Sequence, residues 1–529
     1  MPLISKVGRK RPRGLFALAT VYVILVVGGL TMVYPFLLMA ATGMKGPTDY
    51  QDNKIVPEFW SDREELFKKY VDDKYFGNVD LAAPFYGEAE ALRAFSPTKL
   101  TEPLKPNALD PADAQMYEKF LLSLPNHLWE PGFRLGAGRI HSRLTLKYLD
   151  FLRTKFSSIE ELNQAYLEEN LVFQTVVPPT ERYASKDWKP SNDQKWMDWT
   201  EFKKTLPAEF RIPITKRGLW QYYLRSTYRN RIENVPPDIR GGAKEFAQIE
   251  PDEANPAYRT WMAEGIPEIY RGDSADARWL AVSGSTQLPA AAYDRHFVEQ
   301  NAERLKREFS SRNYSFVLDY ILIHGRAIWN TALFCFLAIV TQLIVNPLAA
   351  YALSRYPIKA TGKVLLFLLA TMAFPAEVTM IPGFLLLRDL GLLNTFAALV
   401  LPMAASGYSI YLLKGFFDSL PRDLYESGSI EGAKETTLFA KITLPMSKPV
   451  LAVIALHAFM AAYGAFLFAF LVAQDQRMWT LMVWIYQLQS RAPKYVMMAA
   501  LTLAAIPTLA VFLAAQRVIL RGLILPGEK

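Results

Sequence analysis

Long uncharged apolar runs flank a long polar segment of this chain. A helix needs about 20 apolar residues to cross a bilayer. Six runs are long enough: residues 14–44, 327–354, 364–387, 391–413, 449–474 and 496–516. The third run contains Glu377, and the other five contain no charged residue. The first run is far longer than the apolar core of about 7–15 residues in a secretory signal peptide, so we expect an uncleaved membrane helix there.

Charge divides the chain in the same way as hydropathy. Residues 42–323 contain 38 Lys/Arg and 42 Asp/Glu, whereas the remaining residues contain 21 and 9. The excess of positive charge therefore lies beside the apolar runs, and the net charge of +8 does not indicate nucleic-acid binding. The pattern predicts an all-α polytopic membrane protein with six transmembrane helices. A large insert, α+β or mostly helical, is expected between the first and second of them.

The short loops predict an orientation. One set of loops and the two termini carry 16 Lys/Arg, whereas the opposite short loops carry four. Positive loops stay in the cytoplasm, so we assign both termini to the cytoplasmic side of a cell inner membrane. The insert then lies outside. The expected domains are residues 1–44 (basic tail and first membrane helix), 45–322 (extracytoplasmic insert) and 323–529 (helices two to six, with a distinctive loop at 418–445).

The insert shows mainly helical signals. Ser158 followed by Glu161 is typical of a capping box that opens a helix to about residue 167. Residues 218–233 and 291–309 are also expected to form amphipathic helices, and 171–177 a short β-like piece. Three tryptophans, Trp188, Trp196 and Trp199, lie close together in the sequence. They indicate either a sugar-stacking or protein-docking surface or an anchor of the domain's core, and we favour the core.

No residues predict catalysis or a metal site. Cys335 is the only cysteine, which excludes an intramolecular disulfide and a CxxC zinc site. The five histidines have no metal-ligand spacing. A GxxxxGK[ST] phosphate loop is also absent from the sequence, so any nucleotide chemistry is expected in another chain.

The loop at 418–445 has an unusual run of small residues. Pro421 and the acidic Asp423 are typical of the first turn of a helix. Gly428 and Gly432 follow, and each would weaken an isolated helix by about 1 kcal/mol. The groove of a partner would explain these small residues. A plain turn packed against its own helices is the alternative.

This loop resembles the EAA loop of ABC-transporter permeases, closest to the maltose-type subunit of the carbohydrate-uptake branch. Glu426 stands at the Glu position, Gly432 at the Gly position, and Ile442, Leu444 and Pro445 follow nine residues later. Ser427-Gly428 stands in place of Ala-Ala. Residues 348–355, 390–395 and the C-terminal end are also similar to this family, whereas the insert lies outside the resemblance. The resemblance implies that nine residues couple the chain to an ATPase: Glu426, Ser427, Gly428, Glu431, Gly432, Ala433, Ile442, Leu444 and Pro445.

The resemblance also implies partners. The chain would be the permease subunit of an ATP-driven importer for a sugar or related polar solute. An ABC ATPase dimer, a second permease subunit and an extracytoplasmic solute-binding protein would accompany it in membrane lipid. ATP and magnesium would be bound by the ATPase, so this chain would itself be no enzyme and hold no cofactor.

Four polar residues within the apolar runs are candidates for the pore wall: Asn330, Gln342, Asn346 and Glu377. Intramembrane polar groups usually face the bundle interior or an aqueous cavity. Glu377 lies between Pro375 and Pro382, where a helix can break and free backbone carbonyls. The alternative is that Glu377 lies near a helix end and hydrogen-bonds to a neighbouring residue or to water.

Two other classes of function stay open from the residues alone. An ion-coupled secondary carrier needs ionisable groups at mid-membrane, and only Glu377 is available there. A membrane-anchored extracytoplasmic glycan-binding protein or enzyme would explain the insert, but it would leave the loop at 418–445 without a role.

Overall fold

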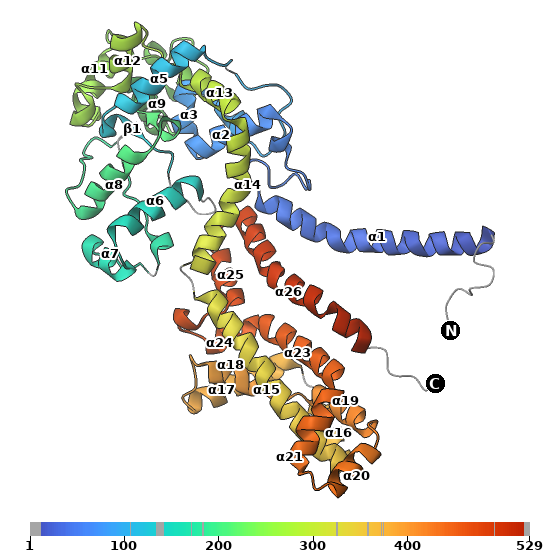
Figure 1. The fold of residues 1–529 in the computed structure, drawn as a ribbon. Helices are drawn as coiled ribbons and strands as arrows, with labels where there is room; N and C mark the ends of the chain where they lie inside the picture. Colours follow the sequence, from blue (N-terminus) through green and yellow to red (C-terminus); the bar gives the residue numbers. More distant parts are fainter. Residues whose placement is uncertain are drawn as a thin grey trace. The chain divides into compact units, whose positions relative to one another are not determined.

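The computed structural model describes residues 12–105, 107–133, 142–170, 172–181, 185–323, 326–356, 359–371, 373, 375–490 and 492–522. Helices dominate this part of the chain (Figure 1). Two compact units separate: Met1–Phe316 with Arg491–Ala499, and Val317–Ser490 with Ala500–Lys529. The basic tail up to Arg11 and the C-terminal end from Leu523 lie outside the described residues.

The first unit begins with the long helix α1 (Pro12–Gly43). Its most apolar 18-residue stretch, within Leu18–Gly43, has none of its residues buried, as expected of a helix that faces lipid. The end of α1 is tied to the insert. Asn313 donates hydrogen bonds from Nδ2 to the carbonyls of Gly43 (2.9 Å) and Lys45 (2.7 Å), and so satisfies carbonyls left free where the helix stops.

The insert is mostly helical, which resolves the choice that its sequence left open. Its helices are α2 (Arg63–Tyr75), α3 (Val79–Tyr86), α4 (Glu88–Phe95), α5 (Pro111–Ser123), α6 (Ser142–Lys155), α7 (Ile159–Tyr166), α8 (Gln194–Thr205), α9 (Lys216–Thr227), α10 (Pro237–Arg240), α11 (Pro256–Thr260), α12 (Ala275–Ser283), α13 (Ala290–Gln300) and α14 (Ala302–Leu318). The strands described are β1 (Trp129–Glu130) and β2 (Ile212–Pro213), which pair antiparallel.

Three sequence expectations for the insert need correction. The β-like piece at 171–177 is wrong, because Phe173–Thr175 forms a 3-10 turn. The helix expected at 218–233 begins two residues earlier and ends at Thr227, before Arg229 and Asn230 take positive φ values. The helix expected at 291–309 is two helices that meet at Asn301, whose Nδ2 donates to the Phe297 carbonyl.

The capping box at the start of α7 is half confirmed. Ser158 accepts a hydrogen bond from the Glu161 backbone N–H, as expected. The Glu161 carboxylate does not accept the reciprocal hydrogen bond from the Ser158 backbone N–H. It accepts instead from the backbone N–H and the hydroxyl of Ser157, one residue earlier.

Aromatic residues fill the larger core of the insert. Trp199 is 2% exposed and packs against Tyr148 and Phe202. Trp188 and Trp196 are partly buried against the same core. The three tryptophans therefore anchor the core, as the favoured interpretation predicts.

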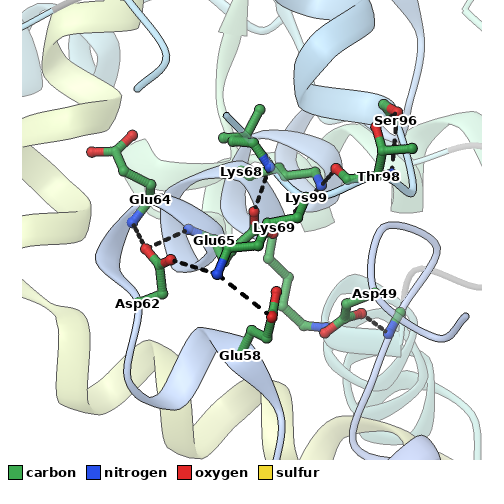
Figure 2. A network of polar contacts seen from close by, with 12 residues as sticks. Asp49, Glu58, Asp62, Glu64, Glu65, Lys68, Lys69, Ser96, Thr98 and Lys99 are labelled. Carbon is green, nitrogen blue, oxygen red and sulfur yellow. Dashed lines mark hydrogen bonds and ion pairs between the residues drawn. The ribbon is translucent and has the colours of Figure 1, made fainter. Parts of the chain in front are cut away.

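A second core surrounds α2, which buries charged side chains as well as apolar ones. Lys69 Nζ lies 2.7 Å from a carboxylate oxygen of Asp49, and Lys68 pairs with Glu65 on its own helix (Figure 2). Burial lowers the pKa of the Lys69 ammonium to about 8, although the charge of Asp49 acts in the opposite direction. Asp62 caps the start of α2 by accepting from the backbone N–H groups of Glu64 and Glu65 (Figure 2).

The second unit contains the helices α15 (Ala327–Arg355), α16 (Thr361–Thr371), α17 (Ala376–Asp389), α18 (Phe396–Val400), α19 (Gly407–Asp418), α20 (Asp423–Ile430), α21 (Glu435–Leu438), α22 (Leu444–Met446), α23 (Lys448–Tyr463), α24 (Phe466–Val472) and α25 (Leu481–Gln489). The helix α26 (Lys494–Gly522) begins in the first unit and continues into the second.

Among the described residues, three helices are long and apolar enough to cross a membrane: α1, α15 and α26. The number rises to five if each of two bent pairs is one span: Phe396–Met403 with Gly407–Asp418, and Glu435–Met446 with Lys448–Tyr463. The run at 364–387 is divided between α16 and α17, with Pro375 directly before α17. A helical fold with several candidate spans is therefore confirmed, while the count of six stays a prediction.

Candidate functional site

The loop after α19 folds into a compact helical module. The helix α20 ends at Ile430, a turn follows at Gly432, and α21 leads through a π-helical turn at Phe439–Thr443 into α22. Figure 1 shows α20 and α21 in the same part of the second unit as α16 and α19. Buried residues of the loop join a shared core with α15 and α19.

Tyr425 anchors α20 to this core. Its side chain is 7% exposed, and the guanidinium of Arg355 lies 3.5 Å from the centroid of its ring. Its hydroxyl shares a hydrogen bond of 2.8 Å with Thr443 Oγ1 from the π-helical turn. A cation over an aromatic face is worth about 0.5–2 kcal/mol, so α20 is held in a defined position.

Glycine is required at two positions of the loop, for a different structural reason at each. A Cβ added at Gly428 would lie 2.7 Å from Cδ2 of the buried Leu438, so this position must stay small for packing inside the loop. Gly432 has φ of +78°, which disfavours a side chain, although a Cβ there would meet nothing within 4 Å. The packing of Gly428 matches the alternative in which small residues serve the chain's own bundle.

One side of the module carries exposed residues. Ile430 is 87% exposed, and Glu426, Ser427, Glu431 and Gly432 are exposed around it. An exposed apolar side chain on a partly acidic surface can anchor another protein. Ala433 and Ile442 are partly buried against the module's own core, Leu444 is half-buried and Pro445 is exposed.

The end of α15 contacts both the module and the end of α19 that leads into it. The Tyr351 hydroxyl donates to a carboxylate oxygen of Glu435 (2.7 Å), and Ser354 Oγ donates to Asp418 (2.7 Å). Arg355 donates to the Phe417 carbonyl (3.0 Å). Sequence reasoning missed these three positioning residues. The resemblance at 348–355 covered them, but it gave no sign that they hold the loop.

Two of the four pore candidates bridge a helix break. Gln342 donates from Nε2 to the Met403 carbonyl (2.9 Å), and Asn346 Oδ1 accepts from the Ser406 backbone N–H (2.9 Å). Met403 and Ser406 lie where the chain bends by 49° before α19. The two amides stand one helical turn apart on α15 and satisfy backbone groups that the break frees.

The other two candidates lie elsewhere. Asn330, near the start of α15, donates to the carbonyls of Arg477 (2.8 Å) and Trp479 (3.0 Å). Glu377 is exposed in the first turn of α17. The structure thus brings Gln342 and Asn346 together and leaves Asn330 and Glu377 apart, and pore lining stays a prediction for all four.

The chain is similar to transport proteins in its second half. Residues 346–524 match the family described as the binding-protein-dependent transport system inner membrane component. Protein LplC of Bacillus subtilis (strain 168) is 30% identical over 250 residues, which are 43% of this chain and 84% of that protein. The sn-glycerol-3-phosphate transport system permease protein UgpE of Yersinia enterocolitica is 33% identical over 206 residues (38% and 73%). The lactose transport system permease protein LacG of Rhizobium radiobacter is 30% identical over 198 residues (37% and 72%).

One solved structure is also similar. It is a chain of a bacterial ABC transporter that imports the acidic polysaccharide alginate, with 26% sequence identity over 39% of this chain and 78% of that chain. The TM-score is 0.34, which is too low to carry an argument about the arrangement of the helices.

Several candidate membrane spans, with a helical loop packed against α15 and α19, fit a multi-pass membrane permease. The chain belongs to the family of inner-membrane components of binding-protein-dependent transport systems, and it is a permease subunit of an ABC importer. Subunits of this family are not enzymes, because a separate subunit hydrolyses ATP. The relatives support neither an ion-coupled carrier nor a membrane-anchored glycan enzyme. The insert at 45–322 lies outside the family match.

Proposed function

We propose that this subunit forms half of the pore of an importer for a sugar or a related polar solute. The relatives named for lactose and for sn-glycerol-3-phosphate support this class of solute. A second permease subunit, identical or different, would complete the pore.

The exposed face of α20 is the proposed docking site for the ATPase. Ile430 would enter an apolar depression of the ATPase, with Glu426 and Glu431 at its rim. The contacts within the second unit support a coupling role. A force on α20 reaches Tyr425, and from there Arg355 at the end of α15. The Tyr351–Glu435 hydrogen bond gives a parallel route from α21 to the same helix.

This coupling role has a direct test in the complete importer. The substitution Ile430→Asp should leave the amount of protein in the membrane unchanged, since the side chain is almost fully exposed. It should lower solute-stimulated ATP hydrolysis and uptake at least tenfold in proteoliposomes. The matched control is Val177→Asp, which places the same charge on an exposed apolar residue of the insert (48% exposed). Undiminished stimulation in Ile430→Asp would reject the docking role.

The proposed topology has six transmembrane helices with both termini in the cytoplasm. The insert then lies outside, where it would contact the solute-binding protein. Support comes from the 16 basic residues on one face of the short loops. Protease added to spheroplasts should cleave the insert, while a fluorescent protein fused to the N-terminus stays intact. Cleavage of the fusion and protection of the insert would invert the topology.

A further inference from the structure

A cavity of about 350 Å³ lies in the second unit, between helices that include the candidate membrane spans α15 and α26. Residues of α14, α15, α23 and α26 form most of its wall. Its lining includes Ile321, Ile328, Cys335, Phe459, Leu503 and Pro507. The family match and the loop at 418–445 assign no role to this cavity.

The hydroxyl groups in the wall already have partners within the protein. Thr331 Oγ1 donates to the Ala327 carbonyl (2.7 Å) and accepts from the Leu481 backbone N–H (2.8 Å). The Tyr463 hydroxyl donates to the Ala504 carbonyl (2.6 Å). A buried water needs two to four polar partners, and a sugar needs more, so the wall suits neither. Apolar cavities of this kind stay dry and take apolar ligands.

The depth of the cavity suits a hydrocarbon chain. Both α15 and α26 qualify as membrane spans. Ile328 and Cys335 lie two and nine residues beyond Arg326, at the start of α15. At a rise of 1.5 Å per residue, the wall on α15 runs from about 3 to about 14 Å below Arg326. Trp329 is 76% exposed at the same end, as expected of a residue at headgroup level.

Charge indicates which lipid fits. Arg326 is exposed at the start of α15. A guanidinium at this level is placed to pair with a phosphate through charge-assisted hydrogen bonds. We propose that the cavity binds one acyl chain of an anionic phospholipid, with Arg326 holding the headgroup phosphate.

The test uses the complete importer in vesicles of phosphatidylethanolamine and phosphatidylglycerol. A trace of phosphatidylglycerol carries a photoactivatable diazirine in the middle of one acyl chain. After irradiation, mass spectrometry should find lipid adducts on peptides that contain residues 328–335 and 500–507. The absence of adducts there would overturn the proposal, and it is also the result expected if a helix of the second permease fills the cavity.

Two neighbouring substitutions make the test specific. Ala332 is exposed on the cavity wall, so Ala332→Trp should fold, block the opening and lower these adducts at least fivefold. Leu333 is 43% exposed but outside the lining, and Leu333→Trp is the matched control that should leave the adducts unchanged. An equal effect of the two substitutions would overturn the site.

The headgroup contact has its own readout. Arg326→Gln should lower the yield of adducts from the phosphatidylglycerol probe about threefold relative to a phosphatidylethanolamine probe of the same chain. The labelled peptides should stay the same, because the acyl chain keeps its place. An unchanged ratio of phosphatidylglycerol to phosphatidylethanolamine adducts would show that Arg326 does not select an anionic headgroup.

Discussion

The insert and the membrane unit bury polar groups in opposite ways. In the insert, Asp73 accepts from Arg143 and Arg312, so full charges are buried in pairs. In the membrane unit, Gln342 and Asn346 are uncharged and bind backbone groups at a helix break. Charges are expensive to bury in either place, but the insert can surround each with several partners. A bilayer offers no water to a freed backbone group, so a neutral amide from a neighbouring helix must satisfy it.

This contrast predicts which substitutions destabilise each region. The insert depends on networks of buried charges, so the loss of one member leaves the opposite charges with fewer partners. The membrane unit depends on single hydrogen bonds across its breaks, so each loss is smaller and local. Four substitutions or conditions test this difference.

The largest effect is expected at Arg143, which contacts the carboxylates of Asp73 (2.7 Å), Glu209 (2.6 Å) and Glu308 (3.0 Å). The substitution Arg143→Met should destabilise the insert by about 3–5 kcal/mol, because it leaves buried carboxylates without their shared cation. Thermal unfolding of the purified protein and protease resistance of the insert measure it. Arg278→Met removes an exposed pair with Asp273 and should cost about 1 kcal/mol or less. Equal losses from both variants would contradict the buried network.

The second effect is a pH dependence at Lys69. Its pKa is lowered from 10.5 to about 8, so between pH 8 and 10.5 the unfolded chain binds more protons than the folded one. Stability from this group therefore rises with pH through that window, by at most about 2 kcal/mol between pH 8 and 9.5. The measurement is the difference in melting temperature between the wild type and Lys69→Met. A difference that stays constant from pH 7 to 9.5 would show that Lys69 does not titrate there.

The third effect concerns the bridge at the helix break. Asn346→Leu leaves the Ser406 backbone N–H without its acceptor and should cost about 1–2 kcal/mol. Thermal stability of the importer in lipid nanodiscs would show it. Thr341→Val is the control, since Thr341 Oγ1 bonds only to the Leu337 carbonyl of its own helix among the contacts found, and its loss should be nearly neutral. A neutral Asn346→Leu would mean that the bridge does not stabilise the break.

The smallest effect is expected at the turn of the coupling module. Gly432→Ala forces a side chain into a left-handed conformation and should cost about 1–2 kcal/mol. Gly432→Asn should cost less, because asparagine tolerates this conformation better than alanine. Since a Cβ at this position meets nothing, the two variants separate backbone strain from crowding. Thermal stability in nanodiscs measures the loss, and a larger loss with Asn than with Ala would indicate crowding instead.

The sequence by itself determined that this is a helical membrane protein with a large polar insert, because hydropathy and charge act locally. It also identified the loop at 418–445, because the spacing of its residues can be recognised without knowledge of the fold. The tertiary structure decided what those residues touch. Gly428 is small because Leu438 returns to pack on it, and Tyr425 is fixed by Arg355, seventy residues earlier. The contacts at the Ser406 break and the paired charges around α2 also depend on neighbours distant in sequence. A local pattern can show that a group is polar or apolar, but only the folded chain brings the partner that satisfies it.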